Sequence, residues 1–137
     1  MFSYRHAFHA GNHADVLKHI TLLATLRHLM RKDSPLLLVD THAGAGIYRL
    51  DGGAAQTSGE AAAGIARMQA LWAHPDFDEK SASEPANKAQ AAINNEADAL
   101  ADYLALIAGF NRGGNDDWRV YPGSPLLMHA LMTEPAR

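Results

Sequence analysis

The stretch LLLVDTHAGAG, residues 36–46, decides how this sequence is expected to fold. Residues 36–39 form a short uninterrupted apolar run, which predicts a strand buried on both faces, as in a parallel sheet covered by helices. Asp40 then stands at the carboxyl end of that strand, where open α/β sheets bind their ligands. Gly44 and Gly46 carry no side chain, so a ligand can approach the backbone amides there. The stretch therefore predicts a strand that leads into a small-molecule binding loop.

The glycine loop alone leaves its role open. A G-x-G pattern occurs in many loops, so a tight turn without a ligand explains Gly44 and Gly46 as well as a binding loop does. The longer pattern G-x-G-x-x-G of dinucleotide-binding loops is not met, because Arg49 stands where the third glycine would be. A dinucleotide is therefore a disfavoured ligand.

The rest of the chain indicates helices and one more strand. Apolar residues recur at three- and four-residue spacing over residues 12–31, which predicts an amphipathic helix with its first residue as the N-cap. Helical patterns also cover residues 58–75, about 86–110 and 124–135, and residues 118–123 read as a short strand. The polar stretch between the second and third helices is expected to be a loop. This order is an α/β pattern, although only two strands are clear.

Composition narrows the class of protein. With 137 residues, 47% of them hydrophobic, the chain is expected to form one domain with a buried core. The absence of cysteine excludes a disulfide framework and a thiolate zinc site. The sequence contains neither a signal-peptide pattern nor a run of about 18 apolar residues, so a soluble cytoplasmic protein is expected.

Charge is distributed unevenly along the chain. Residues 1–32 carry five basic side chains and one acidic one, a net charge of +4, whereas the remainder carries −7. A basic segment on an acidic protein indicates a face for an anionic partner such as a phosphate. The alternative is a solvated helix whose terminal Arg31 and Lys32 complement the helix dipole.

Three blocks of sequence carry a family resemblance. YRHAFHAGNHADVLKH (residues 4–19), LVDTHAGAG (38–46) and YPGSPLL (121–127) follow one another as in the N-terminal portion of the bacterial 23S rRNA (adenine-N6)-methyltransferase family, large-subunit rRNA methyltransferase J type, which the chain resembles. The resemblance implies S-adenosyl-L-methionine as cofactor and 23S rRNA as partner. The implied fold is a partial Rossmann-like class I methyltransferase fold with a helical insertion after the first strand.

The same resemblance implies one incomplete methyltransferase domain over residues 1–137. Its parts would be a basic N-terminal arm and helix (1–34), a first strand and glycine loop (35–50), a helical insertion (51–115), and a strand and helix of the core (116–137).

The resemblance also assigns site residues. The implied cofactor-binding residues are Lys18, His19, Asp40, His42, Gly44, Gly46 and Ser124. Lys18 would supply a cation for the cofactor carboxylate, and Ser124 a neutral hydroxyl. Without the resemblance, Lys18 reads as a solvated helix residue and Ser124 as an N-cap.

Contacts to the substrate RNA are implied near the start of the chain. Tyr4 would stack on a flipped-out adenine, and Arg5 would contact the RNA beside it. The alternative for Tyr4 is a partly buried anchor of the N-terminal arm. Arg27, Arg31 and Lys32 are further candidates for phosphate contacts.

One expected motif is missing. Adenine-N6 methyltransferases use D/N-P-P-Y/F/W to direct the amine lone pair at the methyl group, but no two of the six prolines in this chain are adjacent. An acidic residue to hold the ribose hydroxyls is also not evident. We therefore expect no catalytic residue in this chain, doubtful activity for the chain alone, and a truncated form of the family protein.

Two other function classes remain open from the residues. One is a non-catalytic nucleic-acid or nucleotide-binding module that uses the basic arm and the glycine loop. The other is a metallohydrolase with His6, His9, His13 and Asp15 as ligands. The resemblance implies no metal and gives these histidines the role of shaping the arm.

Overall fold

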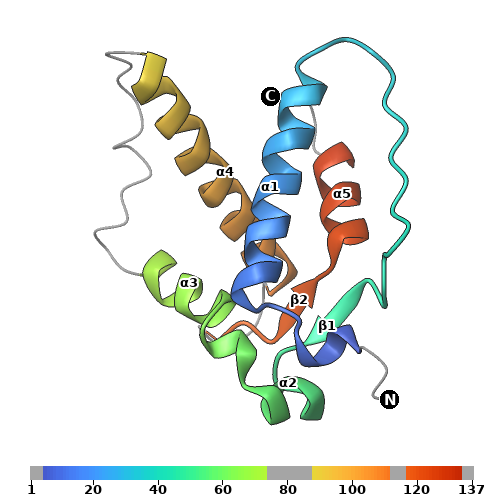
Figure 1. The fold of residues 1–137 in the computed structure, drawn as a ribbon, viewed down its shortest axis with the longest axis vertical. Helices are drawn as coiled ribbons and strands as arrows, with labels where there is room; N and C mark the ends of the chain where they lie inside the picture. The colour runs from blue at the N-terminus through green and yellow to red at the C-terminus, as the bar shows by residue number, and fades with distance from the viewer. Residues whose placement is uncertain (1–4, 74–87, 112–116, 134–137) are drawn as a thin grey trace.

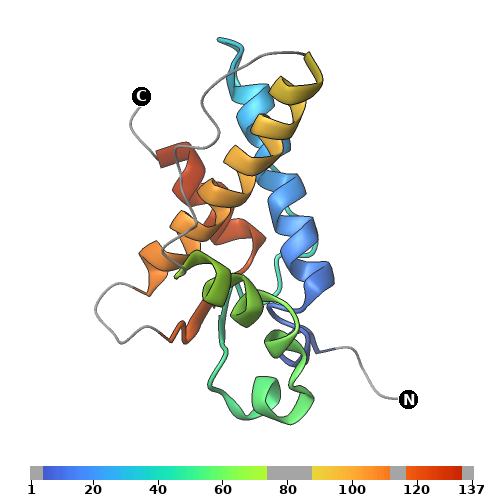
Figure 2. The ribbon, with the colours of Figure 1, turned by 90° about the vertical axis from the view of Figure 1, so that its left-hand side faces the viewer.

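Two long helices form the frame of the protein. The computed structural model describes residues 5–73, 88–111 and 117–133. Helix α1 (His13–Met30) and helix α4 (Lys88–Phe110) pack against each other, as Figure 2 shows. Helix α5 (Ser124–Thr133) packs on another side of α1 (Figure 1). The predictions of these three helices are confirmed, within the described residues.

The N-terminus of α1 has the cap that the sequence predicts. The side chain of Asn12 accepts a hydrogen bond of 2.9 Å from the backbone N–H of Asp15. Such a cap satisfies a helix N–H group that lacks an intrahelical partner. A short 3-10 helix, η1 (His6–Phe8), precedes it and leads the chain into α1.

The sheet has two short antiparallel strands, β1 (Ile47–Arg49) and β2 (Val120–Pro122). Tyr48 lies opposite Tyr121 in the ladder, and both side chains are buried. Strand β2 confirms the strand predicted over residues 118–123. The sheet lies at one end of α1 and α5 (Figure 1).

The strand predicted at residues 36–40 is not formed. These residues have no strand partner, and the side chains of Leu37 and Val39 are 89% and 72% exposed instead of buried. Figure 1 shows this segment as a long connection from the end of α1 to β1. The physical reason is that an apolar strand needs neighbouring strands and covering helices, and the described residues supply no parallel neighbour. The structure is mixed and mainly helical with a small antiparallel sheet, and a Rossmann core is not visible in the described residues.

The helix predicted over residues 58–75 is divided. Helix α2 (Gly53–Ser58), the 3-10 helix η2 (Glu60–Ala62) and helix α3 (Ile65–Trp72) occupy the region. Gly59 ends α2 with φ of +67°, a left-handed conformation that favours glycine, and its N–H donates to the Ala55 carbonyl at 2.9 Å. Helical structure thus begins at Gly53, before the predicted start at residue 58, and consists of three short helices in place of one. The predicted polar loop that follows lies outside the described residues, apart from its last residue, Lys88.

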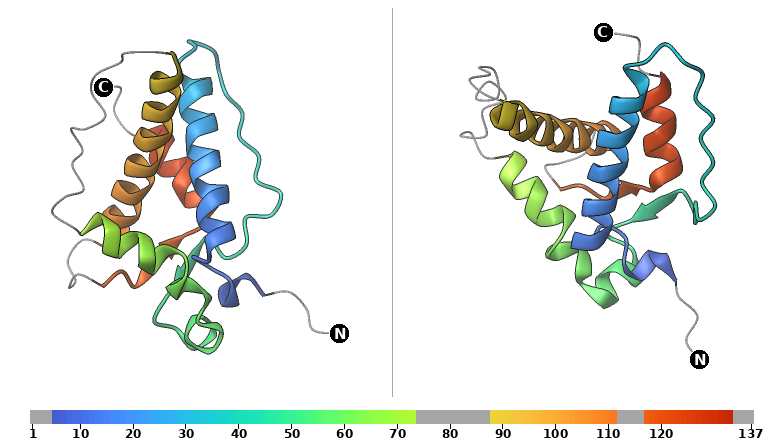
Figure 3. Two further views of the ribbon diagram at one scale, coloured as in Figure 1. Left: turned by 60° about the vertical axis from the view of Figure 1, so that its left-hand side comes forward. Right: turned by 45° about the horizontal axis from the view of Figure 1, so that its top comes forward.

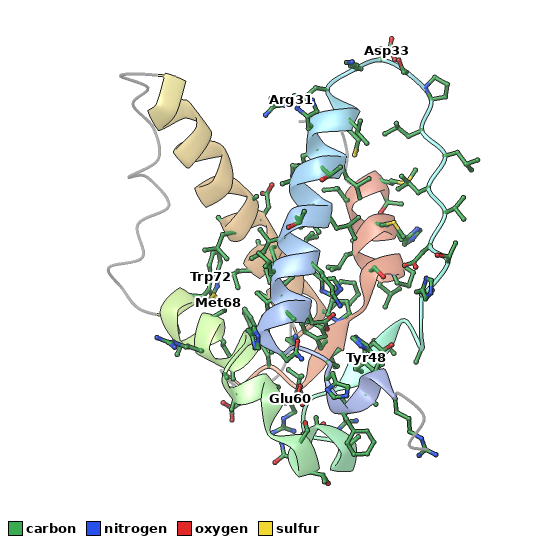
Figure 4. All side chains as sticks on the ribbon, viewed as in Figure 1. Arg31, Asp33, Tyr48, Glu60, Met68 and Trp72 are labelled. Carbon is green, nitrogen blue, oxygen red and sulfur yellow. The ribbon has the colours of Figure 1, made fainter. Side chains whose placement is uncertain are left out.

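The core lies where α1, α4, α5 and the sheet meet. Leu23, Ile107 and Leu127 are fully buried there, one from each of the three helices. Met68 and Trp72 of α3 pack against this cluster (Figure 4). Burial of each large apolar side chain stabilises the fold by about 1.5–3 kcal/mol. Helix α3 contacts α4, and Figure 3 (left) shows it below the lower end of α4. Within the described residues, none of the helices combines the length and apolar character needed to cross a bilayer.

The start of α3 approaches the start of α1 very closely at Gly64. A Cβ atom on Gly64 would overlap the carbonyl oxygen of Gly11 and the backbone of Asn12. Next to it, the N–H of Ile65 donates to the Gly11 carbonyl at 2.8 Å. We therefore expect Gly64→Ala to lower the free energy of unfolding by about 1–3 kcal/mol, because backbone must move. Urea unfolding followed by circular dichroism measures this.

The matched control is Gly109→Ala in α4. A Cβ at Gly109, in the last turn of α4, would meet no atom within 4 Å, and within a helix alanine is favoured over glycine by up to about 1 kcal/mol. This variant should be slightly more stable than the wild type. Equal stability of the two variants would contradict the close approach at Gly64.

Candidate functional site

A cavity of about 950 Å³ lies between α1, the loop before β1 and the start of α5. Its volume is typical of a small-molecule site. The residues that line it are His6, Asp15, Lys18, His19, Leu22, Val39, Asp40, Thr41, His42, Ala43, Gly44, Tyr48, Gly123, Ser124 and Met128. The lining residues come from segments at both ends of the chain, so the cavity forms only on folding.

Helix α1 supplies the charged wall of the cavity. Asp15, Lys18 and His19 are three and four residues apart and therefore share one face of the helix. Asp15 and His19 are only 4% and 5% exposed, whereas Lys18 is exposed. The wall thus combines a buried carboxylate, a buried imidazole and an accessible ammonium group.

The Asp15 carboxylate is held by several groups. One oxygen accepts a hydrogen bond of 3.1 Å from the backbone N–H of Gly11 and lies 3.2 Å from Nε2 of His6. The other oxygen lies 3.9 Å from Nε2 of His19. A buried carboxylate needs such partners, because removing it from water is costly.

Asp40 joins the loop before β1 to helix α5. The hydroxyl of Ser124 donates to one of its oxygens at 2.5 Å, and the backbone N–H of His42 donates to the other at 2.9 Å. These hydrogen bonds, with that of Ser124 the stronger influence, lower the pKa of Asp40 below its usual value. Asp40 is therefore an ionised group at the rim of the cavity at neutral pH.

The glycine loop is fitted around Tyr48. Gly44 has φ of +61°, and a Cβ there would overlap the Tyr48 hydroxyl, which accepts a hydrogen bond of 3.0 Å from the N–H of Ala45. The carbonyl of Gly46 accepts a hydrogen bond of 2.8 Å from the N–H of Gly123. The absence of a side chain at Gly44 therefore makes room for a phenol of this chain.

The structure brings most of the expected cofactor residues together. Those that line the cavity are Lys18, His19, Asp40, His42, Gly44 and Ser124. Gly46 lies behind the lining, in the connection to Gly123. Arg5 is exposed at the start of η1, immediately before His6 of the lining, and Tyr4 lies outside the described residues.

Sequence reasoning missed Tyr48 and gave Asp15 and His6 other roles. Asp15 is the one acidic residue of α1 and stands four residues before His19, on the same face of the helix, and this spacing was a usable signal. Tyr48 had no such signal, because its position under the glycine loop depends on the pairing of β1 with β2.

The histidines of the N-terminal stretch do not form a metal site. His6 faces Asp15, whereas Nδ1 of His9 lies 3.0 Å from Glu60, and Asn12 donates to the same carboxylate at 2.9 Å. In the part of the chain that the structure describes, no group of three or more histidine and acidic side chains could hold a metal ion. The geometry gives the metallohydrolase hypothesis no support.

The basic residues of α1 do not form one face either. Arg27 is paired with Asp102 of α4. Arg31 lies at the end of α1 far from Tyr48 (Figure 4), and 13 residues of helix separate it from Lys18 by about 20 Å. The basic side chains of residues 1–32 are therefore spread along α1 and not gathered at the cavity, and a basic face for an anionic partner stays a prediction.

The cavity thus gathers one lysine, two aspartates, three histidines and the hydroxyls of Thr41, Tyr48 and Ser124 around one space. In comparison with known proteins, residues 33–84 match the family model described as "Ribosomal RNA large subunit methyltransferase D, RlmJ".

Two curated relatives extend the match. The chain is 42% identical over 134 residues to ribosomal RNA large subunit methyltransferase J of Escherichia coli, and 38% identical over 137 residues to the protein of that name from Haemophilus influenzae. The alignments cover 98% and 100% of this chain but 39% and 41% of the relatives, so it spans about two fifths of their length. The resemblance is confirmed: the chain is homologous to part of the large-subunit rRNA methyltransferase J family.

The Asp40–Ser124 contact makes a testable prediction about pH. A depressed pKa adds stability at neutral pH that is lost as the pH falls through the lowered value. In Ser124→Ala we expect the pKa of Asp40 to rise towards its usual value, because its main hydrogen bond is gone. The chemical shift of the Asp40 carboxyl carbon, followed by NMR during acid titration, measures this.

Ser58→Ala is the matched control for that titration. The Ser58 hydroxyl donates to the Ala55 carbonyl at 3.2 Å, at the end of α2 and away from the cavity. The pKa of Asp40 should be unchanged in this variant. A similar shift in both variants would show that the effect does not pass through the Asp40–Ser124 hydrogen bond.

Proposed function

We propose that this chain is part of an S-adenosyl-L-methionine-dependent enzyme that methylates the N6 amine of an adenine in 23S rRNA, and that its cavity holds the amino-acid end of the cofactor. The observation that carries the proposal is the convergence of Lys18, Asp40 and Ser124 on one cavity, from three segments distant in sequence. Homology to part of the rRNA methyltransferase J family supports the same reading.

The chemistry of the cavity suits that end of the cofactor. The methionine end carries an ammonium and a carboxylate, and the cavity offers Lys18 for the carboxylate and the ionised Asp40 for the ammonium. His19, His42 and the loop around Gly44 would complete the contacts. When bound, the cofactor supplies an activated methyl group on its sulfonium.

The proposed fold is the Rossmann-like one. In this proposal residues 1–137 are one incomplete methyltransferase domain, divided at residues 34, 50 and 115 as the resemblance implies. Residues 36–40 form no strand in this chain alone, and in the whole enzyme they would become its first strand by pairing with strands that the described residues do not supply. Support comes from the exposure of Leu37 and Val39, two apolar side chains that such neighbours would cover.

No residue of this chain is assigned to methyl transfer itself. The D/N-P-P-Y/F/W motif is absent from the sequence, so the proposed contribution is to bind and orient the cofactor and the RNA. In this proposal the whole enzyme acts in the cytoplasm.

The charge at Lys18 gives the sharpest test. S-adenosylhomocysteine keeps the amino-acid end of the cofactor, and 5′-methylthioadenosine lacks it. Lys18→Ala should weaken the first ligand about tenfold, the effect of one charge-assisted hydrogen bond, and leave the second unchanged. Isothermal titration of the chain and its variant with both ligands measures this.

Lys32→Ala is the control, because Lys32 is also exposed and lies just beyond the other end of α1. It should bind both ligands like the wild type. Equal weakening of both ligands by Lys18→Ala, or no binding of S-adenosylhomocysteine by the wild type, would overturn the proposed cofactor site.

The proposed RNA contact of Arg5 is testable separately. Arg5 is exposed immediately before His6, at the cavity, so we expect it to meet a phosphate of the RNA that carries the target adenine. Arg5→Ala should weaken binding of an adenine-containing RNA hairpin and reduce the salt dependence by about one ion. Fluorescence anisotropy at several salt concentrations measures both quantities.

The control for this measurement is Arg67→Ala, which removes an exposed arginine from α3, away from the cavity. The same loss in both variants would indicate unspecific charge attraction. RNA affinity with no binding of S-adenosylhomocysteine would favour the alternative function, a nucleic-acid-binding module without chemistry.

A further inference from the structure

A chain of buried polar groups runs from His19 in the cavity wall to Tyr121 and Tyr103, two residues to which the proposed function gives no role. Nδ1 of His19 lies 2.9 Å from the hydroxyl of Tyr121, which lies 2.9 Å from the hydroxyl of Tyr103. The imidazole also stacks on the Tyr121 ring, with centroids 5.4 Å apart and planes inclined by 23°. Helix α1, strand β2 and helix α4 each contribute one member, so the chain of groups is fixed by the fold.

The protonation state of each member follows from burial. Both phenols are fully buried, and burial raises the pKa of each well above its usual value, so both keep their protons. Burial lowers the pKa of His19, although Asp15 acts in the opposite direction. His19 is therefore neutral near pH 7 and carries one ring proton.

The position of that proton follows from what each ring nitrogen faces. If Nδ1 carried it, Tyr121 would accept that proton and would have to donate its own to Tyr103 or to Asp15, which also acts on the Tyr121 hydroxyl. Among the described residues, no further group hydrogen-bonds to the Tyr103 hydroxyl. The lone pair of Nε2 would also face the Asp15 carboxylate, 3.9 Å away.

The opposite assignment turns a proton and not a lone pair towards the carboxylate. Tyr103 then donates to Tyr121, Tyr121 donates to Nδ1 of His19, and the proton on Nε2 is on the side of Asp15, at a distance of 3.9 Å that is too long for a hydrogen bond. Each hydroxyl donates once, and the carboxylate faces a proton.

We propose that Tyr121 is a positioning residue that holds His19 as the neutral Nε2–H tautomer at the wall of the cavity. The Nε2–H group makes no hydrogen bond with Asp15 at 3.9 Å, so it is a donor at the wall of the cavity, which Lys18 also lines. The tautomer follows from the geometry together with the neutral state of His19, whereas its use for an acceptor atom of the cofactor rests on the proposed function. The other ionisable groups that act on His19 are Asp15, His6, Lys18 and Asp40.

Two tyrosine variants separate positioning from simple loss of a buried hydroxyl. Tyr121→Phe removes the donor to Nδ1, so the Nε2–H preference of His19 should weaken and its pKa should rise. Tyr103→Phe removes a hydroxyl from the same network but leaves the donor of Tyr121 in place, so the tautomer should stay. Long-range ¹⁵N NMR spectra of the 137-residue chain, with His19 assigned by comparison with His19→Gln, report both properties.

The wild-type spectrum alone can overturn the proposal, even if a variant fails to fold. An Nδ1–H or protonated His19 at pH 7 would do so, as would an unchanged tautomer in folded Tyr121→Phe. For the cofactor, Tyr121→Phe should weaken S-adenosylhomocysteine about three- to tenfold, with a shifted pH profile, and Tyr103→Phe much less. If the tautomer changes but the affinity does not, the positioning role is overturned.

The outcomes distinguish this inference from the proposed function. If wild-type protein binds no S-adenosylhomocysteine, the proposed cofactor site is wrong, while an Nε2–H tautomer still supports the positioning of His19 by Tyr121. If the ligand binds but His19 has its proton on Nδ1, the positioning by Tyr121 is wrong and the cofactor site stands.

Discussion

The burial of the Asp15 carboxylate is the constraint on which the site depends. Asp15 is only 4% exposed, so its carboxyl group needs polar partners, and here they come from His6 of η1, from the backbone before α1 and, at a longer distance, from His19 of α1 itself. Meeting that requirement fixes the entry of the chain into α1 and the direction of its polar face. His19 and Lys18 are placed as a consequence, one held by tyrosines and the other left open to the cavity.

The ligand-facing groups come from segments that only the fold brings together. The Asp40–Ser124 hydrogen bond joins residues 84 positions apart, and the His19–Tyr121 contact joins residues 102 positions apart. Tyr121 belongs to β2, and Ser124 follows β2 by two residues. The short β1–β2 ladder therefore helps to place both contacts. It sets the distance between the glycine loop and the start of α5.

Local sequence patterns were enough to predict the helices and the strand whose boundaries are marked by their own residues. The three-residue spacing of apolar groups and the Asn12 cap gave α1, and the Y-P-G-S-P block gave β2 and the start of α5. The strand at residues 36–40 was predicted wrongly because its burial depends on neighbours that no local pattern contains. For the site, spacing along α1 could indicate Asp15, but the folding of Tyr48 beneath Gly44 is set by cross-strand pairing.

The exposed run around Leu37 and Val39 has a consequence for how the chain behaves in solution. It presents an apolar ribbon whose backbone amides and carbonyls have no strand beside them, which is the arrangement that edge strands of natural proteins are built to avoid. In concentrated solution, an extended segment of a second molecule would pair with this ribbon. The 36–40 segment thus favours association between copies of the chain, and it does so next to the cavity that Val39 and Asp40 line.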